Sequence, residues 1–140
     1  MFGTDPYQAF RFRVEIMGIE VAGFQSVSGI ERETKIDAFH EGGVNDHEIQ
    51  HAGLTTYPRL KLKRGLADPM LWAWHQAVIL GEIKRSVMSV VLLSETRTEA
   101  WRWIFIGAYP AKWTGADLDA SQSAVATEAV EFVHHGLVGT

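Results

Sequence analysis

Residues 10–16 read Phe10-Arg11-Phe12-Arg13-Val14-Glu15-Ile16, and this stretch decides the class of fold. Its apolar and charged side chains alternate strictly, so in an extended chain all the apolar side chains face one side. This period of two predicts a β-strand that is buried on one face only. Residues 87–93 and 100–108 are rich in branched and aromatic side chains, and a polar turn joins them. We therefore expect antiparallel strands along much of the chain.

Other segments are expected to be extended as well. They are residues 21–36, 58–65 and 124–135. The first of them ends in a stretch that is charged on both faces, through Glu31, Glu33 and Lys35, which is typical of a sheet edge, a wet channel or a polar interface. Residues 38–56 show no periodicity and are interrupted by glycines, so we expect a long loop or a loose hairpin there.

A single helix is expected to begin at Asp68-Pro69, because Asp68 is a good N-cap residue and proline suits the first helical position. Gly81 provides a stop signal. The apolar side chains of this segment cover a wide arc, which favours contact with more than its own sheet. The side chains expected to pack are Leu71, Trp72, Trp74 and Val78.

The order of strands, helix and strands predicts one domain over residues 1–140. We expect a mainly β fold of the α+β type, in which an antiparallel β-barrel or sandwich carries one flanking α-helix. A chain of 140 residues is long enough for one core and too short for two ordinary domains. Five tryptophans indicate a large core or adhesive interfaces.

Composition excludes several classes of function. With 46% apolar and 21% charged residues, the chain has the composition of a soluble globular protein. Its net charge of −4 gives no overall basic field for nucleic acid, and the absence of cysteine excludes disulfides and thiolate chemistry. Residues 1–6 show no signal-peptide pattern, and the longest apolar runs have four residues. We therefore expect no direct membrane insertion by the monomer.

The most tempting chemical motif is His47-Glu48-Ile49-Gln50-His51, which has the spacing of the zinc-binding helix of metalloproteases. That chemistry needs a helix that places both histidines on one face. Gly42, Gly43 and Gly53 bracket the motif, so a polar loop is the favoured interpretation and a zinc hydrolase is the alternative. We expect no catalytic residue, no cofactor and no metal ion.

Basic side chains gather in two short stretches, one before and one after the expected helix. They are Lys61, Lys63, Arg64, Lys84 and Arg85. A solvated strand face is the default interpretation of this cluster, and an acidic partner is the functional alternative.

A series of short sequence blocks runs along nearly the whole chain. The blocks are Asp5-Pro6-Tyr7, Phe10-Arg11-Phe12, Phe24-Gln25-Ser26-Val27-Ser28-Gly29-Ile30, Glu41-Gly42-Gly43, Leu60-Lys61-Leu62-Lys63-Arg64-Gly65, Asp68 to Trp72-Ala73-Trp74, Ala108 to Gly115, and Glu131 to Leu137. Each block is weak alone, but together they are specific. Through them the chain resembles the phage tail tube protein family, which includes the inner tube proteins of contractile injection systems.

The resemblance implies a tail-tube or Hcp-like barrel and a structural, non-enzymatic role. Copies of such a subunit join into rings, commonly of six, and the rings stack into a hollow tube. The implied partners are other copies of the chain, a contractile sheath, and baseplate, spike and terminator proteins, with a protein effector or DNA as payload in the bore. Assembly is expected in the bacterial cytoplasm, and the product is a virion tail or an extracellular injection particle. The alternative is a type VI-like secreted ring protein that carries effectors.

Two candidate surfaces follow when the resemblance is combined with the sequence pattern. The long loop suits stacking onto the adjacent ring through Glu41, Gly42, Gly43, Asn45, Asp46, His47, Glu48 and His51. The doubly polar strand is a candidate lining of the lumen through Glu31, Glu33 and Lys35.

Overall fold

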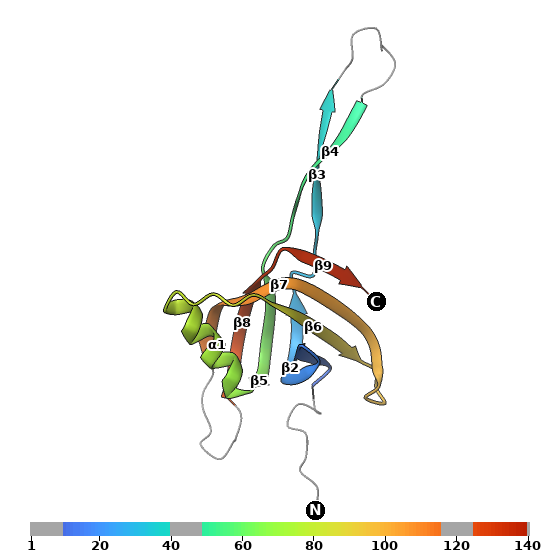
Figure 1. Ribbon diagram of the computed structural model, residues 1–140. Helices are drawn as coiled ribbons and strands as arrows, with labels where there is room; N and C mark the ends of the chain where they lie inside the picture. The colour runs from blue at the N-terminus through green and yellow to red at the C-terminus, as the bar shows by residue number, and fades with distance from the viewer. Residues whose placement is uncertain (1–9, 40–48, 116–124, 140) are drawn as a thin grey trace, which may run out of the picture.

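The computed structural model describes residues 10–39, 49–115 and 125–139 (Figure 1). The elements within these ranges are β1 Phe12–Ile16, β2 Ile19–Ser28, β3 Glu33–Phe39, β4 Ile49–Thr56, β5 Leu60–Ala67, α1 Pro69–Ile79, β6 Ser86–Leu93, β7 Glu99–Gly115, β8 Val125–Val133 and β9 Gly136–Gly139.

The larger sheet closes into a six-stranded antiparallel barrel. Its strands follow the order β6-β1-β2-β5-β8-β7, and β6 also pairs with β7, so the sheet meets itself. The short strand β9 adds to β7 beside β8, with Phe105 opposite Leu137. Closure gives every barrel strand a hydrogen-bonded neighbour on each side. The expectation of a mainly β barrel with one flanking helix is confirmed.

The core fills the interior of the barrel. The alternating residues of β1 place Val14 there without exposure, and Phe24, Phe105 and Phe132 from three other strands are equally buried. Helix α1 packs mainly on β7 and touches β5. It adds Leu71, which is fully buried, to the same core. Large apolar side chains from both the strands and the helix therefore hold one core together.

Helix α1 begins as the sequence predicts. The Asp68 side chain accepts a hydrogen bond of 2.8 Å from the Met70 backbone N–H, and Pro69 occupies the first turn. The helix ends at Ile79, and Gly81 follows with a φ of 90°, a conformation that glycine adopts without strain.

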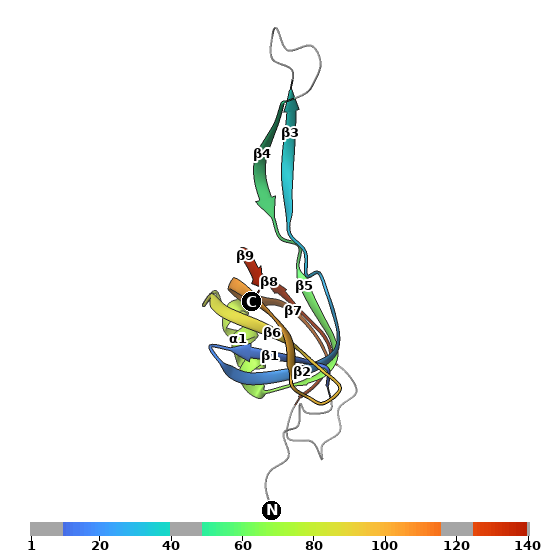
Figure 2. The same ribbon diagram turned by 90° about the vertical axis from the view of Figure 1, so that its right-hand side faces the viewer.

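The segment expected to be extended over residues 21–36 holds two strands, β2 and β3, and the segment over 38–56, expected as a long loop or a loose hairpin, contains β4. Strands β3 and β4 pair with each other in a separate two-stranded sheet. Figures 1 and 2 show this hairpin, which we call the arm, projecting away from one end of the barrel. Hydrophobic periodicity reports which side of a strand is buried, and none of the described side chains of the arm is buried on either side. The pattern therefore left a loop and a hairpin as alternatives, and the structure has the hairpin.

Strand β7 continues through Pro110, beyond the end of the strand expected over residues 100–108. Proline lacks an N–H group and is tolerated in a strand at a bulge. Here the register of β7 with β8 shifts between Pro110 and Lys112, just beyond the point where β7 leaves β6 and β9. The last expected strand, over residues 124–135, is divided into β8 and β9.

Candidate assembly surfaces

The arm carries exposed apolar side chains that the described part of the chain leaves uncovered. The side chains of β3 from Glu33 to Ala38 are all exposed. Ile36 on β3 is 51% exposed and Leu54 on β4 is 74% exposed. A lone two-stranded hairpin is only marginally stable in water, because it buries too little apolar surface to offset its conformational entropy. The arm therefore has the properties of an element that is completed by a contact outside its own subunit.

Cross-strand pairs of polar residues connect the two strands of the arm. Thr34 lies opposite Thr55, and their hydroxyl oxygens are 2.8 Å apart. Asp37 lies opposite His51, and Glu33 lies opposite Thr56. These pairs supply modest local stability, of the order of 0.2–1 kcal/mol each.

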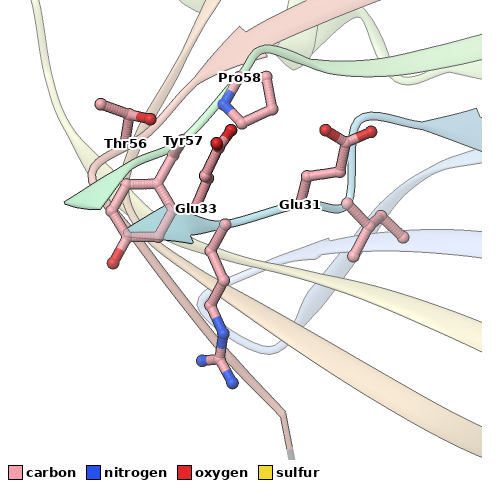
Figure 3. Close-up of a pocket in the computed structure, with 7 residues that line it drawn as sticks. Glu31, Glu33, Thr56, Tyr57 and Pro58 are labelled. Carbon is pink, nitrogen blue, oxygen red and sulfur yellow. The ribbon is translucent and has the colours of Figure 1, made fainter. Parts of the chain in front are cut away.

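A hollow of about 640 Å³ lies where the arm leaves the barrel. Its walls are formed by Ile30, Glu31, Arg32, Glu33, Thr56, Tyr57 and Pro58. Figure 3 shows the carboxylates of Glu31 and Glu33 directed to the same side of the strand, toward the segment that contains Pro58. The Arg32 guanidinium donates a hydrogen bond of 3.0 Å from Nη1 to the Leu137 carbonyl oxygen and so joins the root of the arm to β9.

Aromatic contacts fix the other side of the root. The buried His134 ring lies between Tyr57, at 5.2 Å between ring centroids, and Phe105, at 4.8 Å. Its Nδ1 atom is 3.1 Å from the Gly136 carbonyl oxygen, and its Nε2 atom is buried with no hydrogen-bond partner among the described residues. Burial lowers the pKa of His134 below its ordinary value, against the opposing effect of the Gly136 carbonyl, and the nearby His135 lowers it further.

The predicted lumen residues lie at the root and along the arm. Glu31 is on the link between β2 and β3, while Glu33 and Lys35 are exposed on β3. Of the predicted stacking residues, His51 lies on β4. The others, Glu41, Gly42, Gly43, Asn45, Asp46, His47 and Glu48, lie outside the described residues.

The predicted packing residues of the helix divide into two groups. Leu71 is buried, and Trp74 and Val78 are half-buried, with the Trp74 ring 5.9 Å from that of Phe132. Trp72 is 47% exposed and meets Trp113 edge-to-face at 5.4 Å between centroids. Ile79, Leu80 and Ile83, at and beyond the end of α1, are also exposed. The wide apolar arc of the helix therefore packs only in part against its own barrel.

The described residues of the histidine motif, 49–51, are not helical. Ile49, Gln50 and His51 all belong to strand β4, so the helical turn that a metalloprotease requires is not formed at these positions. Residues 47 and 48 lie outside the described part. Within the described ranges, no three His, Asp or Glu side chains come close enough together to hold a metal ion. No helix of those ranges combines the length and apolar character needed to cross a bilayer.

The root of the arm contains interactions that sequence reasoning missed. Arg32, Tyr57 and His134 are far apart in the chain and carry no shared motif. The one available signal was the change from apolar alternation to charged residues after Ile30, which marks the place where the chain leaves the barrel.

The described part of the chain thus combines a closed barrel with an uncovered arm and an apolar helix face. The chain belongs to the family of the T4-like virus tail tube protein gp19, whose sequence model matches residues 8–138. The family resemblance seen in the sequence blocks is thereby confirmed. No curated protein matches the chain significantly.

Solved structures of similar chains agree with this family. A chain of the anti-feeding prophage (AFP) baseplate is 23% identical with a TM-score of 0.69, and the match covers 99% of this chain and 97% of that one. A chain of the PVC sheath–tube complex, an extracellular contractile injection system in the extended state, is 19% identical with a TM-score of 0.70 and coverages of 94% and 89%. Hcp1 from Flavobacterium johnsoniae is 15% identical with a TM-score of 0.54 and coverages of 93% and 94%. The fold is thus that of tail tube and Hcp-like barrels.

Proposed function

We propose that this chain is a structural subunit of the inner tube of a contractile phage tail or of a tail-like injection system. Copies associate into rings, with six as the expected number, and the rings stack into a hollow conduit for a payload of protein effector or DNA. The observation that carries the proposal is the arm, which projects from a closed barrel with its apolar side chains uncovered, in a chain whose family is that of tail tube proteins.

The arm supplies the contact between rings in this proposal. Seven residues in β3 and eight in β4, at about 3.3 Å per residue, give the arm a reach of about 23–26 Å beyond its root, which matches the length of the eight-residue barrel strand β5. An arm of this reach overlaps much of a subunit in the next ring. Burial of Ile36 and Leu54 there removes apolar surface from water and stabilises the stack. The segment from Glu41 to His51 is the proposed stacking contact.

The exposed helix surface is proposed to meet other subunits or proteins around the ring. Trp72, Ile79 and Leu80 present apolar surface that a neighbour would cover. Glu31, Glu33 and Lys35 are proposed to contribute charge to the bore at the junction between rings. The proposed partners are further copies of the chain, the sheath, and the baseplate, spike and terminator proteins. Chains of baseplate, sheath–tube and terminator structures are among those with this fold, which supports that set.

The role is structural, and the proposal assigns no catalytic residue, cofactor or metal ion to the chain. It places assembly in the bacterial cytoplasm and the finished tube in a virion tail or an extracellular particle. The type VI-like alternative has the weaker support, because the Hcp1 chain has the lower TM-score of 0.54.

The arm can be removed without opening the barrel. Glu33 and Thr56 are cross-strand partners at the root, so residues 34–55 can be replaced by Asn-Gly, which forms a tight hairpin turn. We expect this shortened chain to fold and to form at most single rings, while the wild-type chain forms long tubes in negative-stain electron micrographs. The matched control, Thr34→Ala, keeps the arm and loses one hydroxyl pair, and it should form tubes.

Long tubes from the shortened chain would contradict the stacking role of the arm. A wild-type chain that stays monomeric at high concentration, with no ring or tube in the micrographs, would contradict the tube proposal itself.

A further inference from the structure

One outer face of the barrel collects basic side chains from several strands. We call it the basic sheet face, and its charged members are Arg59, Lys61, Lys63, Arg64, Lys112 and Glu131. Lys61 lies opposite Glu131 across the β5–β8 pair, and Lys112 lies opposite Glu131 across the β8–β7 pair. This face therefore crosses β5, β8 and the second half of β7.

The charge of this face is opposite in sign to the charge of the chain. Among the described residues, the five cationic side chains lie near two carboxylates, Glu131 and Glu31, of which Glu31 lines a hollow together with Arg59, Lys61 and Glu131, whereas the whole chain carries −4. Glu131 lies 3.5 Å from Arg59 Nη1 and 3.9 Å from Lys112 Nζ, so its charge is shared by two cations. Lys61, Lys63 and Arg64 have no ion pair with another described residue. Because exposed charges are screened over about 10 Å at 0.1 M salt, a partner close to this face responds to the local excess of positive charge and only weakly to the distant acidic residues.

None of the described residues on the same face is an exposed large apolar residue. The exposed large apolar side chains of the described residues lie elsewhere: on α1 and the link after it, on the arm, at the β1–β2 turn, and on β6, the first half of β7 and β9. The side chains beside the cations are small or polar, including Ser26, Ala129 and Thr114. In an assembly, apolar surfaces become contacts between subunits and polar surfaces stay in water. The basic sheet face therefore has the properties of the water-filled wall of a bore.

The backbone of Arg64 supports an exposed role for its side chain. Leu60 and Leu62 point into the core, so alternation along β5 would direct residue 64 inward as well. Instead, Arg64 has a φ of 55°, the left-handed region that non-glycine residues rarely adopt, and its side chain is exposed next to Lys63. A local departure from strand geometry thus adds a cation to the face.

We propose that the basic sheet face lines the bore of the tube and binds the acidic surface of a protein cargo. This inference rests on the proposed tube function and names the class of cargo that the tube holds. A carboxylate-rich protein surface complements spaced lysines, each of which acts as a flexible point charge. Nucleic acid fits less well, because the described residues of the face include no exposed aromatic ring for base stacking and because Glu131 lies among the cations.

The location of the face is tested on the wild-type tube. A cryo-electron microscopy map of assembled tubes should place Lys61, Lys63 and Lys112 on the inner wall. A map with these side chains on the outer surface, or buried between subunits, would overturn the inference while leaving the tube function intact. Absence of any tube from the wild-type chain would instead contradict the proposed function.

The cargo class is tested by loading. Tubes are assembled with a small folded protein of strongly negative charge, with a charge-neutralised variant of the same protein, or with duplex DNA, and are then sedimented. We expect the acidic protein to be retained at least about tenfold more than its neutral variant, and most of that excess to disappear when salt is raised from 0.1 M to 1 M and the Debye length shrinks to about 3 Å. Equal retention of both proteins, or stronger retention of DNA than of the acidic protein, would overturn the cargo assignment.

Matched charge reversals connect the retention to this face. Lys61→Glu with Lys63→Glu should abolish the selective retention, whereas Lys84→Glu, a charge reversal of an exposed lysine on the link after α1, should leave it unchanged. If the double variant forms no tubes, the milder Lys63→Gln serves in its place and should lower the retention severalfold. Full retention by a Lys61/Lys63 variant that assembles would contradict the proposal.

Discussion

The barrel and the arm are built from the same kind of element, yet their stability comes from different sources. Each barrel strand pairs on both edges and faces a core in which Val14, Phe24 and Phe132 are fully buried. The arm strands pair only with each other, and Ile36 and Leu54 stay exposed. Folding free energy is therefore concentrated in the barrel, and in the proposed tube the arm gains its stability from contacts made after folding. A substitution should affect either folding or assembly according to the region in which it lies.

The largest expected effect comes from a large-to-small substitution in the core. Phe132→Ala removes a fully buried ring that packs against Trp74, and it should lower the free energy of unfolding by about 3–5 kcal/mol. Ile36→Ala on the arm should change it by less than about 0.5 kcal/mol and instead reduce tube length in micrographs. Urea denaturation of the unassembled subunit measures both. Comparable destabilisation by the two substitutions would show that the arm packs on its own barrel.

A pair of glycines sharpens the same contrast. A Cβ at Gly65 would overlap the carbonyl oxygen of Gly23 and approach Phe24 Cδ1 to 2.6 Å, so Gly65→Ala forces β5 and β2 apart. We expect a loss of about 3 kcal/mol. A Cβ at Gly53 on the arm would lie 3.1 Å from both Asp37 Oδ2 and the Lys35 carbonyl oxygen, in a hairpin that can adjust. Gly53→Ala should therefore leave the midpoint of barrel unfolding in urea within experimental error, and a clear shift would argue against independent regions.

The barrel was easier to predict from the sequence than the arm, because its strands are buried on one side and those of the arm are exposed. Burial on one side of a strand creates a period of two, and this period made residues 10–16 and 58–65 recognisable, while residues 87–93 were recognised by their branched apolar side chains. The cap at Asp68 likewise records a local interaction that one residue type satisfies. The arm buries neither face in the subunit, so its strands leave no such period, and β4 was expected as a loop or a loose hairpin.

Long-range contacts at the root of the arm were beyond the reach of pattern reasoning. Arg32 meets Leu137 over 105 positions of sequence, and Tyr57 meets His134 because the barrel closes. The lumen residues were predicted from their charge and the stacking residues from the length of the loop. Only the structure shows that Glu33 and Lys35 lie on the arm, whereas Lys61 and Lys63 lie on the barrel. The sequence shows the basic cluster, but only the fold shows that Arg85 is separate from the basic sheet face. Arg85 lies 4.9 Å from the centre of the Tyr109 ring and donates a hydrogen bond to the Gly107 carbonyl oxygen.

A smaller effect is expected from pH, and it belongs to the barrel. His134 has a lowered pKa in the folded state because it is buried. Well above pH 6.5 the ring is neutral in both states. As the pH falls through 6.5, the unfolded chain binds a proton that the folded chain resists, so stability falls until the folded pKa is reached. We expect His134 to contribute a loss of up to about 1 kcal/mol between pH 7.5 and 5.5.

His134→Phe keeps an aromatic ring between Tyr57 and Phe105 and removes the titrating group. The pH-dependent loss should therefore be smaller in this variant when urea denaturation is compared at the two pH values. The chain with residues 34–55 replaced should retain the loss, since the buried ring belongs to the barrel. An unchanged pH dependence in His134→Phe would show that other groups control it.

The smallest expected effect concerns the one place where the barrel departs from strand geometry on the basic sheet face. The left-handed conformation of Arg64 lowers the free energy of unfolding by about 1–2 kcal/mol relative to an ordinary strand residue. Glycine adopts this conformation without strain, but its greater freedom in the unfolded chain lowers the free energy of unfolding by about 0.5–1 kcal/mol. Arg64→Gly should therefore raise the free energy of unfolding by up to about 1 kcal/mol, measured in urea, while lowering the retention of acidic protein in assembled tubes. Arg97, at the β6–β7 turn with a φ of 64°, provides the matched control, because Arg97→Gly relieves similar strain without changing the face. A stabilised Arg64→Gly with unchanged retention would remove Arg64 from the cargo contact, and a destabilised one would show that the guanidinium supports the fold instead.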